Sequence, residues 1–423
     1  MSLRCRSLFS PLQVGPMHIK NRFMRSATCE QMSERDGRPS RQLFDVMSDL
    51  IDGDVGLIIP GSMYTLETGK ISHKQSGLTS KEMAEDWRPV ISYAHQNDAK
   101  VMFQLSHGGF LSLSQRVEVK KIKKDKQKKK YFMNSNDQNT SQKVFIQNDN
   151  SNNVNDIGKV GELNEITTRN IFRGYNKIFS YIKNLKQSEI EDIISSFANA
   201  AKLAESVGAD GVQIHASHGY LLSEFLAPIS NFRTDEFGRT LGNKTKIIRE
   251  IVDAIRQSTK PSFSVSIKIG TMFGISQKKL SQIISKHLNN GIDFYEISTG
   301  YLNPLSTIRV QPTKFNVRGI AQRIINPWPF YEEYCVDAAK YVKKKSPEKI
   351  IASVGGWRDS KSMEKAISRG KIDLISMSRP FIREPNLVRK IKDGKSRHAK
   401  CKNCGKCMLD HGNNRLGVHC YFP

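Results

Sequence analysis

The stretch SEIEDIISSFANAAKLAESVGADGVQIHASHGY, residues 188–220, contains one complete α/β unit. Its first four residues, Ser188–Glu191, have the spacing of a capping box, which predicts a helix over Ile190–Val207. Gly208 is expected to end that helix, because glycine readily adopts the left-handed conformation that follows a helix end. The apolar run Gly211–His215 then predicts a strand buried on both faces, and polar residues follow it directly. The segment therefore reads as helix, tight turn, buried strand and polar turn.

The same unit recurs along the chain. Eight short apolar runs alternate with helical patterns, which predicts an α/β fold of the (β/α)₈ TIM-barrel type. A doubly wound open sheet is the alternative, but the G-x-G-x-x-G turn that usually marks it is absent from the sequence. The predicted strands are Arg22–Ser26, Val55–Pro60, Val101–Leu105, Gly211–His215, Phe263–Ile269, Phe294–Ser298, Ile350–Val354 and Asp373–Met377. The other predicted helices are Arg41–Ile51, Glu82–Gln96, Lys244–Gln257, Gln277–Asn289, Tyr331–Lys345, Ser360–Ser368 and Glu384–Lys392.

Three segments lie outside this alternation. Leu8–Ile19 is expected to form a hairpin that closes the barrel floor. Residues 116 to about 186, after strand three, hold a lysine run and then an Asn/Ser/Asp-rich run, so a disordered low-complexity insertion is expected there. We therefore predict a barrel over residues 1–395, interrupted by that insertion, and a separate Cys-cluster segment over residues 396–423.

The composition limits the class of protein. No apolar stretch is long enough to span a membrane and the start has no signal-peptide core, so a cytoplasmic protein is expected. The formal net charge is +25. That charge is compatible with a Lys/Asn-biased genome, with an anionic cofactor and substrate, or with a nucleic-acid surface. We expect no nucleic-acid partner, because no recognised binding motif accompanies the charge. A homo-oligomer is left open.

The ends of the predicted strands test the barrel, because reactive groups of such barrels lie at the C-terminal ends of the strands. Polar residues or glycines occur at seven of the eight predicted ends. These ends are Ser26-Ala27-Thr28-Cys29, Pro60-Gly61-Ser62, Gln104 to Gly109, His215 to Tyr220, Lys268, Val354-Gly355-Gly356 and Ser378-Arg379.

The last two strand ends predict a phosphate site. Gly355 and Gly356 let backbone N–H groups approach an anion, and Arg379 adds positive charge. Taken singly, the glycines are compatible with a tight turn and Arg379 with a surface turn. Their position after the last two strands favours phosphate binding.

The motif His215-x-x-His218-x-Tyr220 predicts a site that acts on a carbonyl group. Two imidazoles on one strand-end turn can donate hydrogen bonds to one oxygen atom and polarise it. Tyr220 can then supply a proton as general acid. The alternatives are a metal-binding pair, which lacks a carboxylate at helical spacing beside it, and two structural histidines.

Four of the seven cysteines lie together near the C-terminus. Cys401, Cys404, Cys407 and Cys420 have the spacing C-x₂-C-x₂-C-x₁₂-C. In a reducing compartment this spacing is typical of metal chemistry rather than a disulfide framework. A [4Fe–4S] cluster, a structural zinc ion and an unmetallated remnant are the three interpretations left open.

Several of these blocks together resemble the Old Yellow Enzyme family, and within it the branch that includes the N-terminal barrel of bacterial 2,4-dienoyl-CoA reductase. The strongest likeness is QIHASHGYLLSEFLAPISNFRTDEFG, residues 213–238. Other blocks follow in the order of the family. They are Asn21-Arg22-Phe23, Ser26-Ala27-Thr28, Gln104-Leu105-x-His107, Val354-Gly355-Gly356 and DLISMSRPFIREP over Asp373–Pro385.

The resemblance implies FMN at the barrel mouth and hydride transfer from NAD(P)H through the flavin to an activated C=C bond of an α,β-unsaturated carbonyl substrate. It implies that His215 and His218 bind the substrate carbonyl oxygen and that Tyr220 delivers the proton. For the dienoyl-CoA reductase branch it also implies an Fe–S cluster on the four cysteines. The implied FMN contacts are Ser26, Ala27, Thr28 and Cys29 near N5, Ser62 against the ring, Gln104 at the pyrimidine edge, Lys268 near N1 and O2, and Gly355, Gly356, Ser378 and Arg379 at the phosphate.

The chain also departs from the family pattern. Phe110 stands where relatives often have arginine, Gln31 stands where many have an aromatic substrate contact, and Ser378 replaces a glycine. Arg239 after Gly238 replaces a second glycine. The middle cysteine spacing is one residue shorter than usual. Two other hypotheses are a 2-hydroxy-acid oxidase, for which the late His–Arg pair is missing, and a non-catalytic or RNA-associated flavin-binding protein that acts through the basic insertion.

Overall fold

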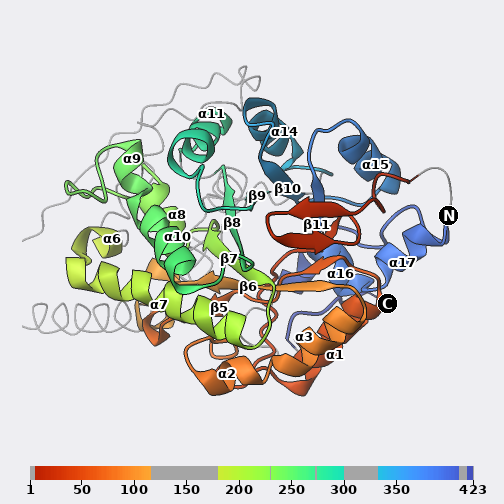
Figure 1. Ribbon diagram of the computed structural model, residues 1–423, viewed down its shortest axis with the longest axis horizontal. Helices are drawn as coiled ribbons and strands as arrows, with labels where there is room; N and C mark the ends of the chain where they lie inside the picture. Colours follow the sequence, from red (N-terminus) through yellow and green to blue (C-terminus); the bar gives the residue numbers. More distant parts are fainter. Residues whose placement is uncertain are drawn as a thin grey trace, which may run out of the picture.

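The chain folds into a closed barrel of parallel strands surrounded by helices, as the sequence predicts (Figure 1). The computed structural model describes residues 5–115, 180–228, 230–271, 274–299, 332–408 and 417–422. The barrel strands follow one another in chain order, and β3 pairs with both β4 and β11, which closes the sheet. They are β3 Phe23–Arg25, β4 Leu57–Ile58, β5 Met63–Tyr64, β6 Lys100–Ser106, β7 Gly211–Ala216, β8 Ser264–Gly270, β9 Phe294–Ser298, β10 Ile350–Val354 and β11 Leu374–Met377.

All eight predicted strands are confirmed close to their predicted bounds. The second is divided into β4 and β5, which both pair with β6, and the residues between them continue alongside β6. Figure 1 shows the helices around the outside of these strands. Because the strands are covered on one side by helices and on the other by the barrel interior, they are buried along almost their whole length.

The outer helices match the predicted segments, with differences that have local causes. Pro385 lies where a helix over Glu384–Lys392 was predicted; it separates α16 from α17, because proline cannot continue a helix. Likewise Pro89 lies in the first turn of α3, where it is tolerated, and the predicted helix Glu82–Gln96 is divided into α2 and α3. The helices are α1 Arg41–Asp52, α2 Lys81–Glu85, α3 Arg88–Gln96, α6 Ser180–Asn184, α7 Gln187–Ser206, α8 Leu221–Leu226, α9 Leu241–Lys244, α10 Lys246–Ser258, α11 Gln277–Gln282, α14 Val336–Lys345, α15 Ser360–Ser368, α16 Arg379–Arg383 and α17 Leu387–Lys392.

The start of α7 was predicted wrongly. The capping box was assigned to Ser188–Glu191, but the N-cap residue is Lys186, two residues earlier, and the helix begins at Gln187. The Glu189 carboxylate accepts a hydrogen bond from the Lys186 backbone N–H at 2.8 Å. Glu189, rather than Glu191, is therefore the acidic residue of the capping box.

The expected hairpin closes the barrel floor. Strands β1 Leu12–Val14 and β2 Met17–Ile19 pair antiparallel. Their inward side chains join one apolar cluster with the lowest interior layer of the barrel. That cluster contains Val14, Met17, Ile19, Met24, Leu57, Ile59, Met102, Phe294, Ala352 and Leu374.

Above this apolar layer the barrel interior becomes polar. Because successive strand residues alternate between the two faces of a sheet, the residue two places after an apolar interior residue also points inward. Met24 is followed in this way by Ser26, Met102 by Gln104, Phe294 by Glu296 and Leu374 by Ser376, and all four polar residues are buried. The polar layer therefore forms the base of the barrel mouth.

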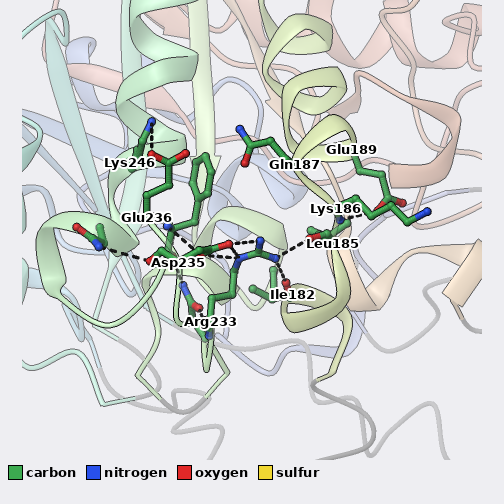
Figure 2. A network of polar contacts seen from close by, with 12 residues as sticks. Ile182, Leu185, Lys186, Gln187, Glu189, Arg233, Asp235, Glu236 and Lys246 are labelled. Atoms are coloured by element: carbon green, nitrogen blue, oxygen red, sulfur yellow. Dashed lines mark hydrogen bonds and ion pairs between the residues drawn. The ribbon is translucent and has the colours of Figure 1, made fainter.

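The family-like stretch Asn231–Gly238 fixes the segment that enters α7. The Arg233 guanidinium donates to the backbone oxygens of Ile182 at 2.7 Å and Leu185 at 2.8 Å, and it pairs with Asp235 (Figure 2). A side chain at Gly238 would overlap the Arg233 backbone, since a Cβ there would lie 2.0 Å from its carbonyl oxygen. This part of the motif has a structural role.

The predicted insertion lies mostly outside the described residues. Residues 116–179 are not described, and the end of the predicted stretch, Ser180–Asn184, forms helix α6, which contacts α8. The disordered stretch was therefore predicted to extend too far toward α7. Within the described residues, no helix is long and apolar enough to cross a membrane. The division at residue 395 stays a prediction.

Candidate active site at the barrel mouth

His215, His218 and Tyr220 lie together at the end of β7. The His215 ring contacts the His218 ring at a centroid distance of 5.1 Å and the Tyr220 ring at 4.7 Å, both edge to face. His218 has a φ of 62° and Gly219 a φ of 78°, so the chain turns sharply and returns Tyr220 toward His215. The His218 ring Nε2 lies 2.8 Å from Ser298 Oγ at the end of β9, two strands along the barrel. The turn thus brings the three predicted catalytic residues together.

Both imidazoles are neutral in the physiological pH range. Burial, the neighbouring His218 and the Lys268 charge lower the pKa of His215 well below its usual value. Burial and Lys268 lower the pKa of His218 to about 3. Neutral imidazoles keep one N–H donor each. In addition, His215 Nδ1 is buried and has no hydrogen-bond partner among the described residues. The pair is therefore suited to donate to an oxygen of a bound molecule.

Lys268 lies beside this pair, in a network that crosses the barrel. Its Nζ donates to Ser26 Oγ at 2.6 Å and lies 3.5 Å from Glu296 Oε2. Ser26 Oγ in turn donates to Glu296 Oε1 at 2.6 Å, and Ser376 Oγ donates to the same oxygen at 2.7 Å. Two predicted flavin contacts, Ser26 and Lys268, are thus joined directly.

Gln104 meets a second glutamine that was not predicted to belong to the site. Gln104 Nε2 donates to Gln213 Oε1 at 2.7 Å between the neighbouring strands β6 and β7. The Gln213 amide nitrogen is buried and has no hydrogen-bond partner among the described residues. A buried donor without a partner is costly, so this atom indicates a polar ligand above the two amides.

The residues after β3 form another side of the mouth. The Thr28 and Cys29 backbone N–H groups both donate to Gly61 O, and Thr28 Oγ1 lies 2.9 Å from Ser378 Oγ. Cys29 has a φ of 56°, and its sulfur accepts from the Gln31 amide at 3.8 Å. Ala27 packs against the apolar interior cluster. Ser62 lies in the connection that follows Gly61, where Gln75 donates to its backbone oxygen.

The predicted phosphate residues line one cavity. Gly355, Gly356, Ser378 and Arg379 surround it, together with Tyr334 and Asn403, which were not predicted. Both glycines have positive φ, and a Cβ at Gly355 would lie 2.4 Å from the Tyr334 ring. Glycine is therefore required here by backbone conformation and by close approach. Tyr334 Oη lies 3.5 Å from the Arg379 guanidinium, at the limit of a hydrogen bond.

The four C-terminal cysteines line a second cavity, which shares Arg379 and Cys401 with the phosphate cavity. Arg383, Lys402 and Lys406 lie over the Phe422 ring, which also lines this cavity. Within the described residues, however, no three His, Cys, Asp or Glu side chains are arranged as a metal-binding group. The structure gathers Cys401, Cys404, Cys407 and Cys420, and the metal stays a prediction.

An apolar wall faces the His/Tyr turn. Ile71, Leu111 and Tyr220 form a buried cluster, against which Cys29 and Phe110 pack. The Glu224 carboxylate accepts from the Phe110 backbone N–H at 3.2 and 3.4 Å and so holds the loop that follows β6. A Cβ at Gly109 would lie 2.5 Å from Glu224 Oε2. Glu224 thereby positions the wall, although it was not predicted as a site residue.

The polar atoms at the mouth fit a flavin mononucleotide. A phosphate group suits the glycine-lined cavity with Arg379, and the amide of Gln213 and Nδ1 of His215 are buried atoms that an isoalloxazine ring or a carbonyl substrate would satisfy. The missed residues Gln213 and Glu296 had one signal in the sequence. Each is a polar residue inside an otherwise apolar strand, two places from an interior position.

Sequence comparisons match the chain to flavin oxidoreductases. The profile of the NADH:flavin oxidoreductase / NADH oxidase family matches residues 7–398. An NADPH dehydrogenase of Clostridium acetobutylicum is 25% identical over 386 residues, which cover 90% of this chain and 93% of the relative. An NADH:flavin oxidoreductase of Gibberella zeae is 25% identical over 402 residues, 90% of this chain and 84% of the relative. An NADH-dependent flavin oxidoreductase of Neonectria sp. is 26% identical, but the chain spans only 44% of its length.

Solved structures share the fold. A 2-naphthoyl-CoA reductase complex superposes with a TM-score of 0.70 at 18% identity, covering 95% of this chain and 54% of the other. A morphinone reductase complex superposes with a TM-score of 0.62 at 17% identity, covering 92% of both chains. At these identities the likeness supports the barrel alone.

Proposed function

Because the chain belongs to the NADH:flavin oxidoreductase / NADH oxidase family and is a flavin- and NAD(P)H-dependent oxidoreductase, we propose that it binds FMN and reduces the activated C=C bond of an α,β-unsaturated carbonyl compound. The observation that carries this proposal is the arrangement of His215, His218 and Tyr220. Two neutral donors and a phenol face one space beside the proposed flavin site.

We assign the FMN contacts as follows. Gly355, Gly356, Ser378 and Arg379 would bind the phosphate, since they line one cavity. Gln104 would bind the pyrimidine edge, and Lys268 would place a positive charge near N1 and O2. Ser26, Ala27, Thr28, Cys29 and Ser62 would line the remaining ring edge. Bound FMN supplies the hydride transfer, first accepting from NAD(P)H and then donating to the substrate.

The chain's own residues would act on the carbonyl substrate. His215 and His218 would donate hydrogen bonds to its oxygen, which draws electron density from the C=C bond. Tyr220 would supply the proton to the carbon next to the carbonyl group. The apolar wall around Phe110 and Leu111 would exclude water from the reacting carbons. This wall favours a substrate with an apolar body.

For the cysteine cavity we propose a [4Fe–4S] cluster, with structural zinc as the alternative. Its support is that the four cysteines line one cavity and that Arg379, Arg383, Lys402 and Lys406 line it as well. Cations of this kind offset the negative charge of a thiolate-bound cluster.

A purified, FMN-reconstituted protein tests the main proposal. It should show flavin absorbance that NAD(P)H bleaches without air and that a simple cyclic enone restores. Arg379→Ala should weaken FMN binding by about 10- to 150-fold, since a hydrogen bond to a charged group contributes about 1.5–3 kcal/mol. Arg383→Ala, four residues further along, is the matched control and should bind FMN with much smaller loss. A colourless protein after reconstitution, or reoxidation by air but not by enones, would contradict the proposal.

The second candidate function is a non-catalytic flavin-binding protein that acts through the basic insertion. Nothing in the described residues favours it over catalysis, and the insertion itself, residues 116–179, lies outside them. Retained flavin absorbance without turnover would favour it.

A further inference from the structure

Glu296 is the buried carboxylate at the centre of the polar layer. It lies on β9, its exposed fraction is 0%, and it contacts residues from three other strands. Ser26 comes from the end of β3, Lys268 from β8 and Ser376 from β11. A carboxylate in this position needs compensating partners, because burying an isolated charge is very costly. Its partners are two hydroxyl donors and one ammonium group.

The hydrogen-bond directions in this network are determined by chemistry. An ammonium group can only donate, so Ser26 Oγ must accept from Lys268. The single Ser26 hydroxyl proton is then directed to Glu296 Oε1. Lys268 has three N–H donors, and the described residues supply contacts for two of them, Ser26 and Glu296. The third is available to a ligand at the barrel mouth.

We propose that Glu296 is a positioning residue that holds Lys268 as the cation facing the flavin, and that it thereby sets the reduction potential of the bound cofactor. This inference rests on one part of the proposed function, namely that a flavin binds at the barrel mouth. It does not depend on which substrate is reduced.

The electrostatics of the interior support the assignment. Burial lowers the pKa of Lys268, and Glu296 opposes that effect most strongly. Arg25 acts against the Lys268 charge, but it is paired with Glu30 at 2.6 Å. His215 and His218 are neutral, and burial keeps the Cys335 thiol protonated because it raises the pKa of that group. Among the described residues, Glu296 is therefore the counter-charge that favours the ammonium form of Lys268.

The consequence is a specific number of protons per reduction. Two-electron reduction of bound FMN takes up a hydride from NAD(P)H, or two electrons and one proton from an electrode, and adds one negative charge next to Lys268. If Lys268 is already an ammonium, no second proton is needed. If it is a neutral amine, the same reduction also draws one proton from water onto its Nζ. For a two-electron couple, each proton lowers the midpoint potential by about 30 mV per pH unit.

The test is a redox titration of FMN-loaded protein between about pH 6 and about pH 9, where free lysine is protonated. Wild type should follow one slope of about 30 mV per pH unit. Glu296→Gln, which keeps the shape but removes the charge, should acquire a range with about twice that slope. Glu296→Asp keeps the charge and should retain the wild-type slope. A single slope in Glu296→Gln, or a break to the steeper slope in wild type, overturns the proposal.

A second variant covers misfolding. If Glu296→Gln does not fold, the double variant Glu296→Gln/Lys268→Met removes both buried charges. It should fold, bind FMN, have a lower potential than wild type and show one slope. If the double variant also fails to fold, Glu296 supports the barrel rather than Lys268, and the proposal is wrong. Failure of the proposed function is separately visible, as missing flavin absorbance or missing enone turnover in wild type.

Discussion

Replacing His215 by alanine should slow the reaction with the carbonyl substrate much more than the reduction by NAD(P)H. The His215 imidazole is buried and neutral, and its Nδ1 has no hydrogen-bond partner in the part of the chain that the structure describes. The substrate oxygen acquires negative charge as hydride arrives, so the lost contact is a hydrogen bond to a charged group. Such a bond contributes about 1.5–3 kcal/mol, or about 10- to 150-fold in rate.

The assay separates the two half-reactions. Flavin absorbance is followed anaerobically in rapid mixing, first with NAD(P)H and then with a cyclic enone. His215→Asn is the matched control, because an asparagine amide still offers an N–H donor, and it should recover part of the loss. The His215 ring also contacts the Tyr220 ring at 4.7 Å. We therefore expect His215→Ala and Tyr220→Phe to be non-additive in the enone step.

The reasoning would be refuted by an equal loss in both half-reactions, which would mean that the histidine serves the flavin or the fold. A loss below about threefold in the enone step would also refute it, since that is less than the weakest charged hydrogen bond considered. The pH dependence adds a further check. Because the pKa of His218 is about 3, the enone step should show no break near pH 6.5 from either histidine.

Three further predictions concern the surroundings of the site. Cys404→Ser should lower the iron or zinc content of anaerobically purified protein. It should also weaken FMN binding by up to about tenfold, because Arg379 and Cys401 line both cavities. Unchanged metal content would exclude a cysteine-bound metal. His107 accepts a hydrogen bond from the Gly109 N–H at 3.1 Å, and burial lowers the pKa of His107 to about 4. Because the unfolded chain binds a proton at this residue below about pH 6.5 and the folded chain does not, the free energy of unfolding falls as the pH falls below that value. Between about pH 7.5 and 5, chemical denaturation should therefore show that His107→Gln loses about 2 kcal/mol less of its free energy of unfolding than wild type does. Equal losses would show that His107 is already protonated or solvated. Arg233→Ala should lower the free energy of unfolding by about 3 kcal/mol, because the backbone carbonyls of Ile182 and Leu185 and the Asp235 carboxylate lose the Arg233 guanidinium. Arg239→Ala is the control. An equal effect of the two substitutions would contradict the structural role of Arg233.

Much of the fold was predictable from local patterns. Alternating apolar runs and helical segments predicted all eight strands, and Leu8–Ile19 was correctly predicted to close the floor. The errors lie where neighbouring signals compete. The acidic residues near Lys186 allow more than one capping box. Pro89 lies in the first turn of α3, just after the break in the predicted helix Glu82–Gln96, and the helix predicted from Glu384 begins only at Leu387, after Pro385. The two prolines were visible in the sequence, whereas the sequence alone does not distinguish Glu189 from Glu191 as the capping carboxylate.

Candidate site residues were predictable where they follow a strand. His215, His218 and Tyr220, and likewise Gly355, Gly356, Ser378 and Arg379, stand at strand ends, and every strand end of a parallel barrel faces the same mouth. The structure places them there. Gln213 and Glu296 were missed because they lie inside strands, in runs that read as apolar. Tyr334 and Asn403 were missed because they approach the phosphate cavity from other segments.

By itself, the sequence determined the order of the elements, the polar character of the strand ends and the family to which the chain belongs. Only the tertiary structure decided which of those polar groups meet. Ser26, Lys268, Glu296 and Ser376 are far apart along the chain, yet they form one network. The physical reason is that closing the barrel, through the pairing of β3 with β11, and the stagger between adjacent strands set which interior side chains share a layer. Local periodicity predicts whether a side chain points into the barrel, but it does not predict which side chain from another strand it contacts there.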